Sequence, residues 1–429
     1  MLKSNVDIRG LKHFGKMSGG YFFTTVLNNA IPLLVLPILT RYLAPEEYAN
    51  IALFSFYLAL SNALTGSSIP ALISKNFFDK EKDFIARLIG NSIGVVAIFS
   101  IITLAIILLS YPWLKNFFDL SLIWMVMLPL TSLAWIIFNM GLTVMRNNKK
   151  LLQFTNHQVG NTIINIAISL FFIVVLLWGW QGRIWGIIIS YLLSAIIMFI
   201  YLRKNGYIRF HYSKQIIKEI LELVFPMIPN SFQSVIISQV GIFFIQYYFS
   251  KELLGVYSIG FQLAFSIKLL ITALGLSWSP FMYQQLSDGI KMNRVYVTRM
   301  FLLLISILLA GVLFINIFAG FILKLLTTPA YFDAVVFVPW LTLGFFFHGL
   351  YVFQMPILIK NEKQNYISLV SFINMFIMIG LNIWFSHLFG YIGIAYAYFS
   401  TYFLMFVALA WKAQRVFPLP WLSALKVWN

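Results

Sequence analysis

The sequence of 429 residues contains no cysteine, so a disulfide, a thiolate nucleophile and a cysteine-ligated metal site are all excluded. Charge is scarce as well. Charged residues make up 10% of the chain and hydrophobic residues make up 61%. Soluble domains usually contain about 25% charged and about 45–50% apolar residues. The composition therefore excludes a soluble fold.

Long apolar segments fill most of the chain. Each is long enough to cross a hydrocarbon core, which needs about 20 helical residues. The segments cover residues 20–39, 48–73, 88–110, 120–143, 154–178, 184–202, 223–247, 254–284, 300–323, 334–359, 367–385 and 392–411. They predict an all-α polytopic membrane protein with 12 transmembrane helices.

The basic residues are distributed unequally between the two sides of these segments. Of the 30 Lys and Arg residues, 24 lie at the termini and in the gaps on one side. Lys268 lies within a span, and the opposite gaps contain only Arg41, Lys115, Arg183, Lys251 and Lys324. Because cytoplasmic loops carry an excess of Lys and Arg, we predict that the N and C termini are cytoplasmic. Membrane orientation explains most of the basic excess, and we expect no nucleic-acid partner.

The chain repeats itself at an offset of 206 to 214 residues. Tyr42–Glu47 lines up with Tyr248–Leu253, and Arg146–Lys149 lines up with Lys360–Lys363. Each copy has an even number of spans, so both copies enter from the same side and the repeats are parallel. We predict three parts, which are an N-terminal six-helix bundle (1–205), a cytoplasmic linker (206–218) and a C-terminal six-helix bundle (219–429).

Several short motifs resemble those of a known family. They are the turn Arg41–Tyr48, the basic turn Arg146–Lys149 with Asn161 and Asn165 downstream, and Asn374 and Asn382 ahead of Gly390–Gly393. In these motifs and in its two six-span halves, essentially the whole chain resembles the bacterial oligosaccharide and polysaccharide flippases of O-antigen type. That family belongs to the multidrug/oligosaccharidyl-lipid/polysaccharide exporter superfamily.

The resemblance implies two six-helix bundles around a central cavity that opens alternately to each face of the bacterial inner membrane. It implies a substrate too: an undecaprenyl-diphosphate-linked oligosaccharide that moves to the periplasmic leaflet for O-antigen, lipopolysaccharide or capsule biosynthesis. The partners implied are the lipid bilayer, this glycan and other polysaccharide assembly proteins. Neither a cofactor nor chemistry on the substrate is implied.

Lys268 is the most informative single position, because it lies near the middle of the eighth span. A mid-membrane ammonium costs at least about 2.5 kcal/mol on insertion scales, so it should face a watery cavity or a partner. On a helical wheel Tyr257, Phe261 and Thr272 share its face. We predict that Lys268 holds a diphosphate. The alternative is a lysine that snorkels or bonds neighbouring carbonyls.

Four arginines at span ends could capture or release phosphate at a cavity mouth. They are Arg41, Arg87, Arg146 and Arg299. Interfacial anchoring and the positive-inside rule would place arginines at such ends too, although Arg41 lies on the opposite side. Both interpretations stay open.

Polar residues within the spans are candidates for a cavity lining. They are Asn28, Asn62, Asn139, Asn161 and Thr272. Amides and hydroxyls at helical spacing can bond sugar hydroxyls. They can equally bond neighbouring helices together.

His157 and His348 are candidates for a proton relay, although a lone histidine within a span is more often a hydrogen-bonded core residue. No Asp or Glu lies deep within a span, which weakens a cation-coupled mechanism. Acidic residues near the span ends leave coupling to an H⁺ or Na⁺ gradient open; these are Glu46, Glu222, Glu252 and Asp333.

Two other functions must be weighed. An ion-coupled small-molecule exporter of multidrug type would have the same fold. A membrane glycan polymerase or ligase would expose a sizeable outer loop with catalytic Arg, His or Asp, whereas each outer gap here is about ten residues or fewer. We therefore expect a transporter and not an enzyme.

Overall fold

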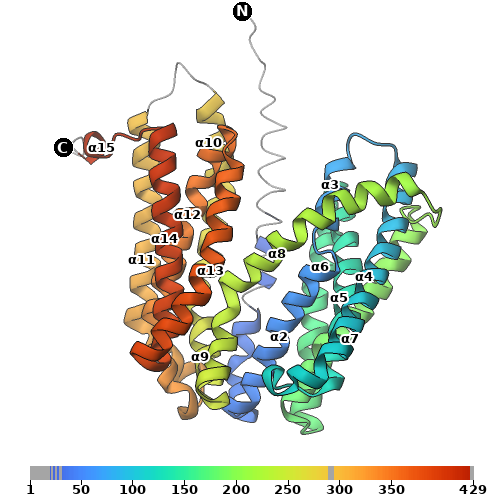
Figure 1. The fold of residues 1–429 in the computed structure, drawn as a ribbon, viewed down its shortest axis with the longest axis horizontal. Coiled ribbons are helices and arrows are strands. Elements are labelled where there is room, and N and C mark those ends of the chain that lie inside the picture. The colour runs from blue at the N-terminus through green and yellow to red at the C-terminus, as the bar shows by residue number, and fades with distance from the viewer. Residues whose placement is uncertain (1–19, 21–22, 25–26, 29–30, 288–293, 426–429) are drawn as a thin grey trace, which may run out of the picture. The chain divides into compact units, whose positions relative to one another are not determined.

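The structure is a computed structural model that describes residues 20, 23–24, 27–28, 31–287 and 294–425. This described part contains no β-strand and is almost entirely helical (Figure 1). After a helix over Ile31–Tyr42, the longer helices are α2 (Pro45–Thr65), α3 (Ile69–Asn76), α4 (Lys82–Phe118), α5 (Leu122–Asn147), α6 (Leu151–Leu170), α7 (Gly179–Lys204), α8 (Lys214–Tyr248), α9 (Lys251–Ala264), α10 (Ser266–Ser287), α11 (Arg294–Leu326), α12 (Val338–Lys360), α13 (Gln364–Phe389) and α14 (Gly393–Val416). The chain is thus an all-α polytopic membrane protein, as predicted.

Among the described residues, nine helical stretches are long and apolar enough to cross a membrane. Helices satisfy their own backbone hydrogen bonds, which hydrocarbon requires of any spanning segment. The pair α2–α3 adds a tenth stretch and bends by 46° between its two helices. Gly66 lies at this bend with φ +108°, a conformation that glycine adopts without strain. Of the first predicted span, 20–39, part lies outside the described residues.

Two further predicted spans depart from a single regular α-helix. The eighth span divides at Phe265 into α9 and α10, where the amide of Lys268 bonds the carbonyl of Phe265 (2.9 Å). This hydrogen bond joins residues three apart, so the chain is wound more tightly here than in an α-helix. The fifth span ends in a short π-helix, Phe171–Val175, which follows α6 directly.

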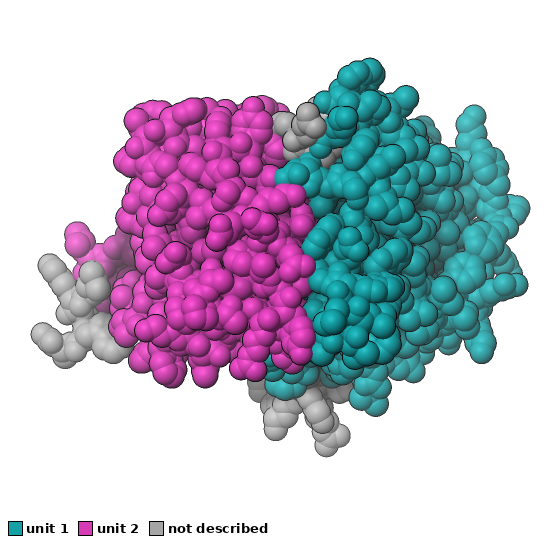
Figure 2. Space-filling model, turned by 90° about the horizontal axis from the view of Figure 1, so that it is seen from below, with its two compact units in different colours: residues 1–35, 54–232 teal, residues 36–53, 233–429 magenta. Residues whose placement is uncertain are grey.

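The chain divides into two compact units, coloured teal and magenta in Figure 2. Unit 1 comprises residues 1–35 and 54–232, and unit 2 comprises residues 36–53 and 233–429. This division differs from the predicted domain boundaries in two places. The end of the first span and the turn after it belong to unit 2, and the division after residue 232 falls inside α8.

Packing explains why residues 36–53 belong to unit 2. The Tyr331 hydroxyl donates to the carbonyl of Leu43 (2.8 Å), and the Tyr48 hydroxyl donates to Gln262 (2.7 Å). Burial, followed by the nearby Tyr48 and Glu47, raises the pKa of Tyr331, so its hydroxyl stays protonated and remains a donor. The turn therefore packs against elements that follow it in sequence by more than two hundred residues.

The first part of α8 belongs to the core of unit 1. Ile216, Ile220 and Val224 are buried there among apolar side chains of α3, α4 and α5. Within the predicted linker, residues 207–213 form neither helix nor strand, and residues 214–218 are the first turn of α8. The connection between α7 and α8 is thus nine residues long, 205–213.

Candidate functional site

Unit 1 contains an open cavity of about 310 Å³. It lies among the first span, α2, α5, α6 and α7. Its polar lining consists of Asn28, Ser55, Asn62, Asn161, Thr162, Asn165 and Arg183, and its aromatic lining consists of Trp135 and Tyr191. Among the lining residues that the structure describes, Arg183 is the only one with a charged side chain. The cavity is therefore polar with a positive charge on one wall.

Arg183 lies in the first turns of α7, and its guanidinium turns into the bundle. Nη1 donates to Asn165 Oδ1 and, at 2.8 Å, to the hydroxyl of Ser169. Asn165 lies well inside the predicted span of α6. An interfacial arginine that snorkels would point the other way, toward water. Two acceptors on α6 thus fix the orientation of this cation.

The contact between α6 and α7 is unusually close at this level. A Cβ added to Gly186 would collide with the Ser169 hydroxyl and would lie only 2.9 Å from the Ser169 backbone nitrogen, so a residue larger than glycine would push the helices apart. Further along, Asn161 donates to the Ser190 carbonyl (3.1 Å) and to the Ser194 hydroxyl (2.8 Å). The amides of α6 therefore bond α7 as well as line the cavity.

Three of the predicted lining residues, Asn28, Asn62 and Asn161, lie around this one cavity. Asn28 accepts a hydrogen bond from Thr162. The Oδ1 atom of Asn62 is buried and has no hydrogen-bond donor in the described part of the chain. Asn139 instead donates to the carbonyl of Trp135 on its own helix (2.8 Å) and is absent from the described lining.

Arg183 was predicted only to lie in an outer gap, with no role in binding. The signal that could have found it is the four-residue spacing of Asn161, Asn165 and Ser169, which puts three polar side chains on one face of α6. A basic residue one helix later is a natural partner for such a face.

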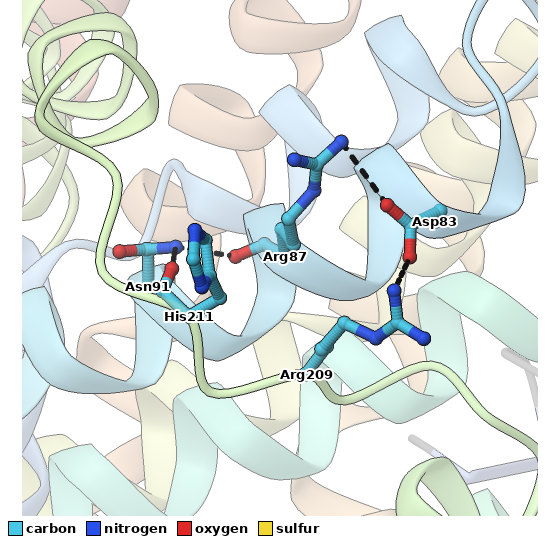
Figure 3. A network of polar contacts seen from close by, with 5 residues as sticks. All are labelled: Asp83, Arg87, Asn91, Arg209 and His211. Atoms are coloured by element: carbon cyan, nitrogen blue, oxygen red, sulfur yellow. Dashed lines mark hydrogen bonds and ion pairs between the residues drawn. The ribbon is translucent and has the colours of Figure 1, made fainter.

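Arg87, the predicted phosphate contact on α4, pairs with Asp83 (3.0 Å), which also pairs with Arg209 (Figure 3). Their side chains are 37%, 39% and 65% exposed, so each ion pair contributes only about 0–1 kcal/mol. Backbone contacts add to this anchoring, because the Arg209 amide donates to the carbonyl of Ala86 (3.0 Å). The connection 207–213 is therefore fastened to α4.

Lys268 of unit 2 lies directly after the break in the eighth span. It is half-buried, and its ammonium lies 5.2 Å from the ring centre of Phe265. No carboxylate in the described part of the chain forms an ion pair with it. Thr272 donates to the carbonyl of Lys268 (2.9 Å) and not to a group across a cavity.

His348 lies on α12, which packs against α10, the helix that contains Lys268. The imidazole ring lies edge-on to Tyr402 of α14, with ring centres 4.9 Å apart, and stacks on Tyr351 at 6.3 Å. Its Nδ1 atom is buried without a hydrogen-bond partner in the described residues. Two positions that the sequence offered as separate candidates are thus neighbours in unit 2.

None of the remaining predicted residues is part of the described lining of the unit 1 cavity. Arg41 and Arg146 are exposed at helix ends, and Arg299 is half-buried in the first turns of α11. His157 is on α6, and its ring centre lies 6.4 Å from that of Tyr201. Within the described residues no group of three His, Asp or Glu side chains could hold a metal ion.

Residues 16–286 match the sequence model of a family described as polysaccharide biosynthesis protein. A curated relative is an uncharacterized membrane protein from Haemophilus influenzae (strain ATCC 51907 / DSM 11121 / KW20 / Rd), 26% identical over 282 residues. The alignment covers 64% of this chain and 66% of that protein, slightly less than two thirds of the relative's length.

The fold is similar to those of solved transporters. An inward-facing multidrug resistance MATE family transporter of the MOP superfamily has a TM-score of 0.72 at 15% identity, with 95% of this chain and 96% of that chain covered. A MOP superfamily transporter from Pyrococcus furiosus has a TM-score of 0.62 at 14% identity, with 92% and 96% covered. At such identities the likeness shows the fold alone.

Proposed function

This chain belongs to the polysaccharide biosynthesis protein family, and from that premise we propose that it is a flippase for a lipid-linked oligosaccharide. The observation that carries the proposal is the family match over most of a multi-pass helical chain whose fold is that of MOP superfamily transporters. The substrate we propose is an undecaprenyl-diphosphate-linked glycan repeat unit. It would move from the cytoplasmic to the periplasmic leaflet of a bacterial inner membrane, for O-antigen or capsule biosynthesis.

Lys268 supports an anionic substrate. A lysine within an apolar helix is normally matched by a carboxylate, and none pairs with it in the described part of the chain. We propose that the diphosphate of the lipid carrier supplies the matching negative charge, and that the ammonium of Lys268 holds it as a point charge. Transport then requires no bond to be made or broken in the glycan.

The neighbouring His348 supports coupling of this site to protons. Its imidazole lies on α12, which packs against α10, the helix that contains Lys268, and the ordinary pKa of an imidazole is close to physiological pH. We propose that binding of the diphosphate beside Lys268 favours the protonated form of His348. Coupling to Na⁺ is the alternative.

An ion-coupled exporter of small molecules is the second candidate, because the fold is shared with multidrug MATE transporters. Purified protein in liposomes distinguishes the two. Uptake of cationic drugs driven by an H⁺ or Na⁺ gradient would favour the exporter. The positive wall of the unit 1 cavity and the uncompensated Lys268 disfavour a cationic substrate.

Depletion of the protein tests the flippase directly. We expect the lipid-linked glycan to accumulate on the cytoplasmic leaflet, where it is protected from a membrane-impermeant glycan label in intact spheroplasts. Re-expression should restore labelling. If depletion leaves the labelled fraction unchanged, the proposed flippase function is wrong.

A further inference from the structure

The cavity of unit 1 has the chemistry of a binding site for one sugar residue that bears a carboxylate. We infer that it is a subsite for an acidic sugar of the transported glycan, in which Arg183 contacts the carboxylate and Asn62 accepts a hydrogen bond from a sugar hydroxyl. The inference rests on the proposed function for the identity of the larger substrate. It concerns a different unit from the one that contains Lys268.

Size limits what the cavity can take. Its volume of about 310 Å³ is at the lower end of the range for ligand pockets, about 300–1,000 Å³. A single monosaccharide ring fits such a space, whereas a repeat unit of several sugars does not. The cavity therefore selects one residue of a glycan.

The charge of the lining determines which kind of sugar the cavity binds. Arg183 is the only charged residue in the described lining, so no carboxylate of the protein there would repel an anion. Asn165 and Ser169 hold one nitrogen of the guanidinium, which fixes the plane in which a carboxylate would be recognised. Guanidinium groups recognise carboxylates through paired, charge-assisted hydrogen bonds. A diphosphate has more charge than this one cation would balance.

Hydrogen bonding supports a sugar over a simple anion. The buried Oδ1 of Asn62 lacks a donor within the described residues, and a buried acceptor without a partner is costly. An anion without a hydroxyl group, such as sulfate, cannot donate to it. A sugar hydroxyl can, and Trp135 and Tyr191 provide aromatic surface for the apolar face of a sugar ring.

Binding to the full-length protein in lipid nanodiscs tests the subsite without any transport. Trp135 lines the cavity, so its contribution to fluorescence, isolated as the difference between wild type and Trp135→Phe, reports ligand entry. The probes are methyl β-glucuronide, methyl β-glucoside and inorganic phosphate. We expect saturable binding of the glucuronide and binding of the glucoside and of phosphate that is weaker by about tenfold or more.

Two variants assign the contacts. Arg183→Gln should weaken the binding of the glucuronide about tenfold or more, while the affinity for the glucoside stays nearly unchanged. Asn62→Ala should weaken the binding of both sugars. Because Asn62 Oδ1 serves no described partner, Asn62→Ala should also not lower the unfolding temperature. Lys324→Gln, an exposed residue of unit 2, is the control for loss of one positive charge.

Several results would overturn the inference. They are absence of saturable glucuronide binding to folded wild type, equal affinity for the glucoside or for phosphate, and unchanged glucuronide affinity in Arg183→Gln. Failure of the proposed function gives a different result. If wild-type protein does not restore export to depleted cells, the flippase assignment fails whatever the nanodiscs bind. If wild type restores export and binds no glucuronide, only the subsite fails.

Discussion

The side chain of Asn91 on α4 donates a 2.9 Å hydrogen bond to the backbone carbonyl of His211, in the irregular connection between α7 and α8 (Figure 3). Its Oδ1 accepts from the amide of Ser213 (3.3 Å). One buried amide therefore satisfies backbone groups of a segment that has no regular hydrogen-bonding pattern of its own. The connection between the two predicted halves is fastened and does not behave as a free tether.

Asn91→Ala should release this connection. Losing two hydrogen bonds and leaving backbone groups without partners costs about 1–3 kcal/mol, and the cost falls on the segment 207–213. We expect several-fold faster trypsin cleavage after Arg209 or Lys214 in detergent-solubilised protein. The control is Asn139→Ala, because the described bond of Asn139 runs only to its own helix. Equal cleavage rates in the two variants would contradict the anchoring role of Asn91.

A pair of glycines on α4 gives an independent test of the same contact. A Cβ on Gly90 would overlap the backbone carbonyl of Arg209, whereas a Cβ on Gly94 meets no described atom within 4 Å. Gly90→Ala should displace the connection and lower stability by about 1–3 kcal/mol. Gly94→Ala should be neutral or stabilising by up to about 1 kcal/mol. Thermal unfolding followed by size-exclusion chromatography measures both, and similar shifts would show that the contact at Gly90 is not tight.

Gly255 tests why the turn after the first span belongs to unit 2. A Cβ at this position would overlap the backbone of Pro45, which cannot move aside as a flexible side chain could. We expect Gly255→Ala to lower the yield of folded protein in membranes severely. Gly320→Ala on α11 is the matched control, because a Cβ there meets no described atom within 4 Å. Normal yield and melting temperature for Gly255→Ala would argue against close packing of α9 on this turn.

Much of the fold was predictable, because length and apolarity define a membrane span and both can be counted along the sequence. The interruption at Phe265 was not predicted, since neither proline nor glycine lies beside it to signal one. The division of the chain was predicted as two halves of the sequence. The observed division differs because the turn at Pro45 packs closely against the backbone of Gly255, and both belong to unit 2. The ends of the sequence repeats do not determine where this turn packs.

The candidate sites were predicted less completely. Lys268 and His348 were each identified as isolated polar residues in apolar helices, but 80 residues separate them and only the packing of α10 on α12 brings them together. Arg183 was predicted only to lie in an outer gap between two apolar segments. Its orientation depends on Asn165 and on the close approach at Gly186, both long-range effects that a single sequence does not display.

Lys268→Met should abolish glycan export while the protein still inserts into the membrane. Removing a mid-membrane ammonium favours insertion by about 2.5 kcal/mol or more, so loss of export could not be attributed to failed insertion. Lys268→Arg keeps the charge and should retain partial export, because a guanidinium still attracts phosphate but occupies more space beside Phe265. Lys324→Met removes an exposed lysine at the end of α11 and serves as the charge control. The measurement is surface glycan per unit of membrane-inserted protein at native expression, and wild-type export by Lys268→Met would exclude the role proposed for this lysine.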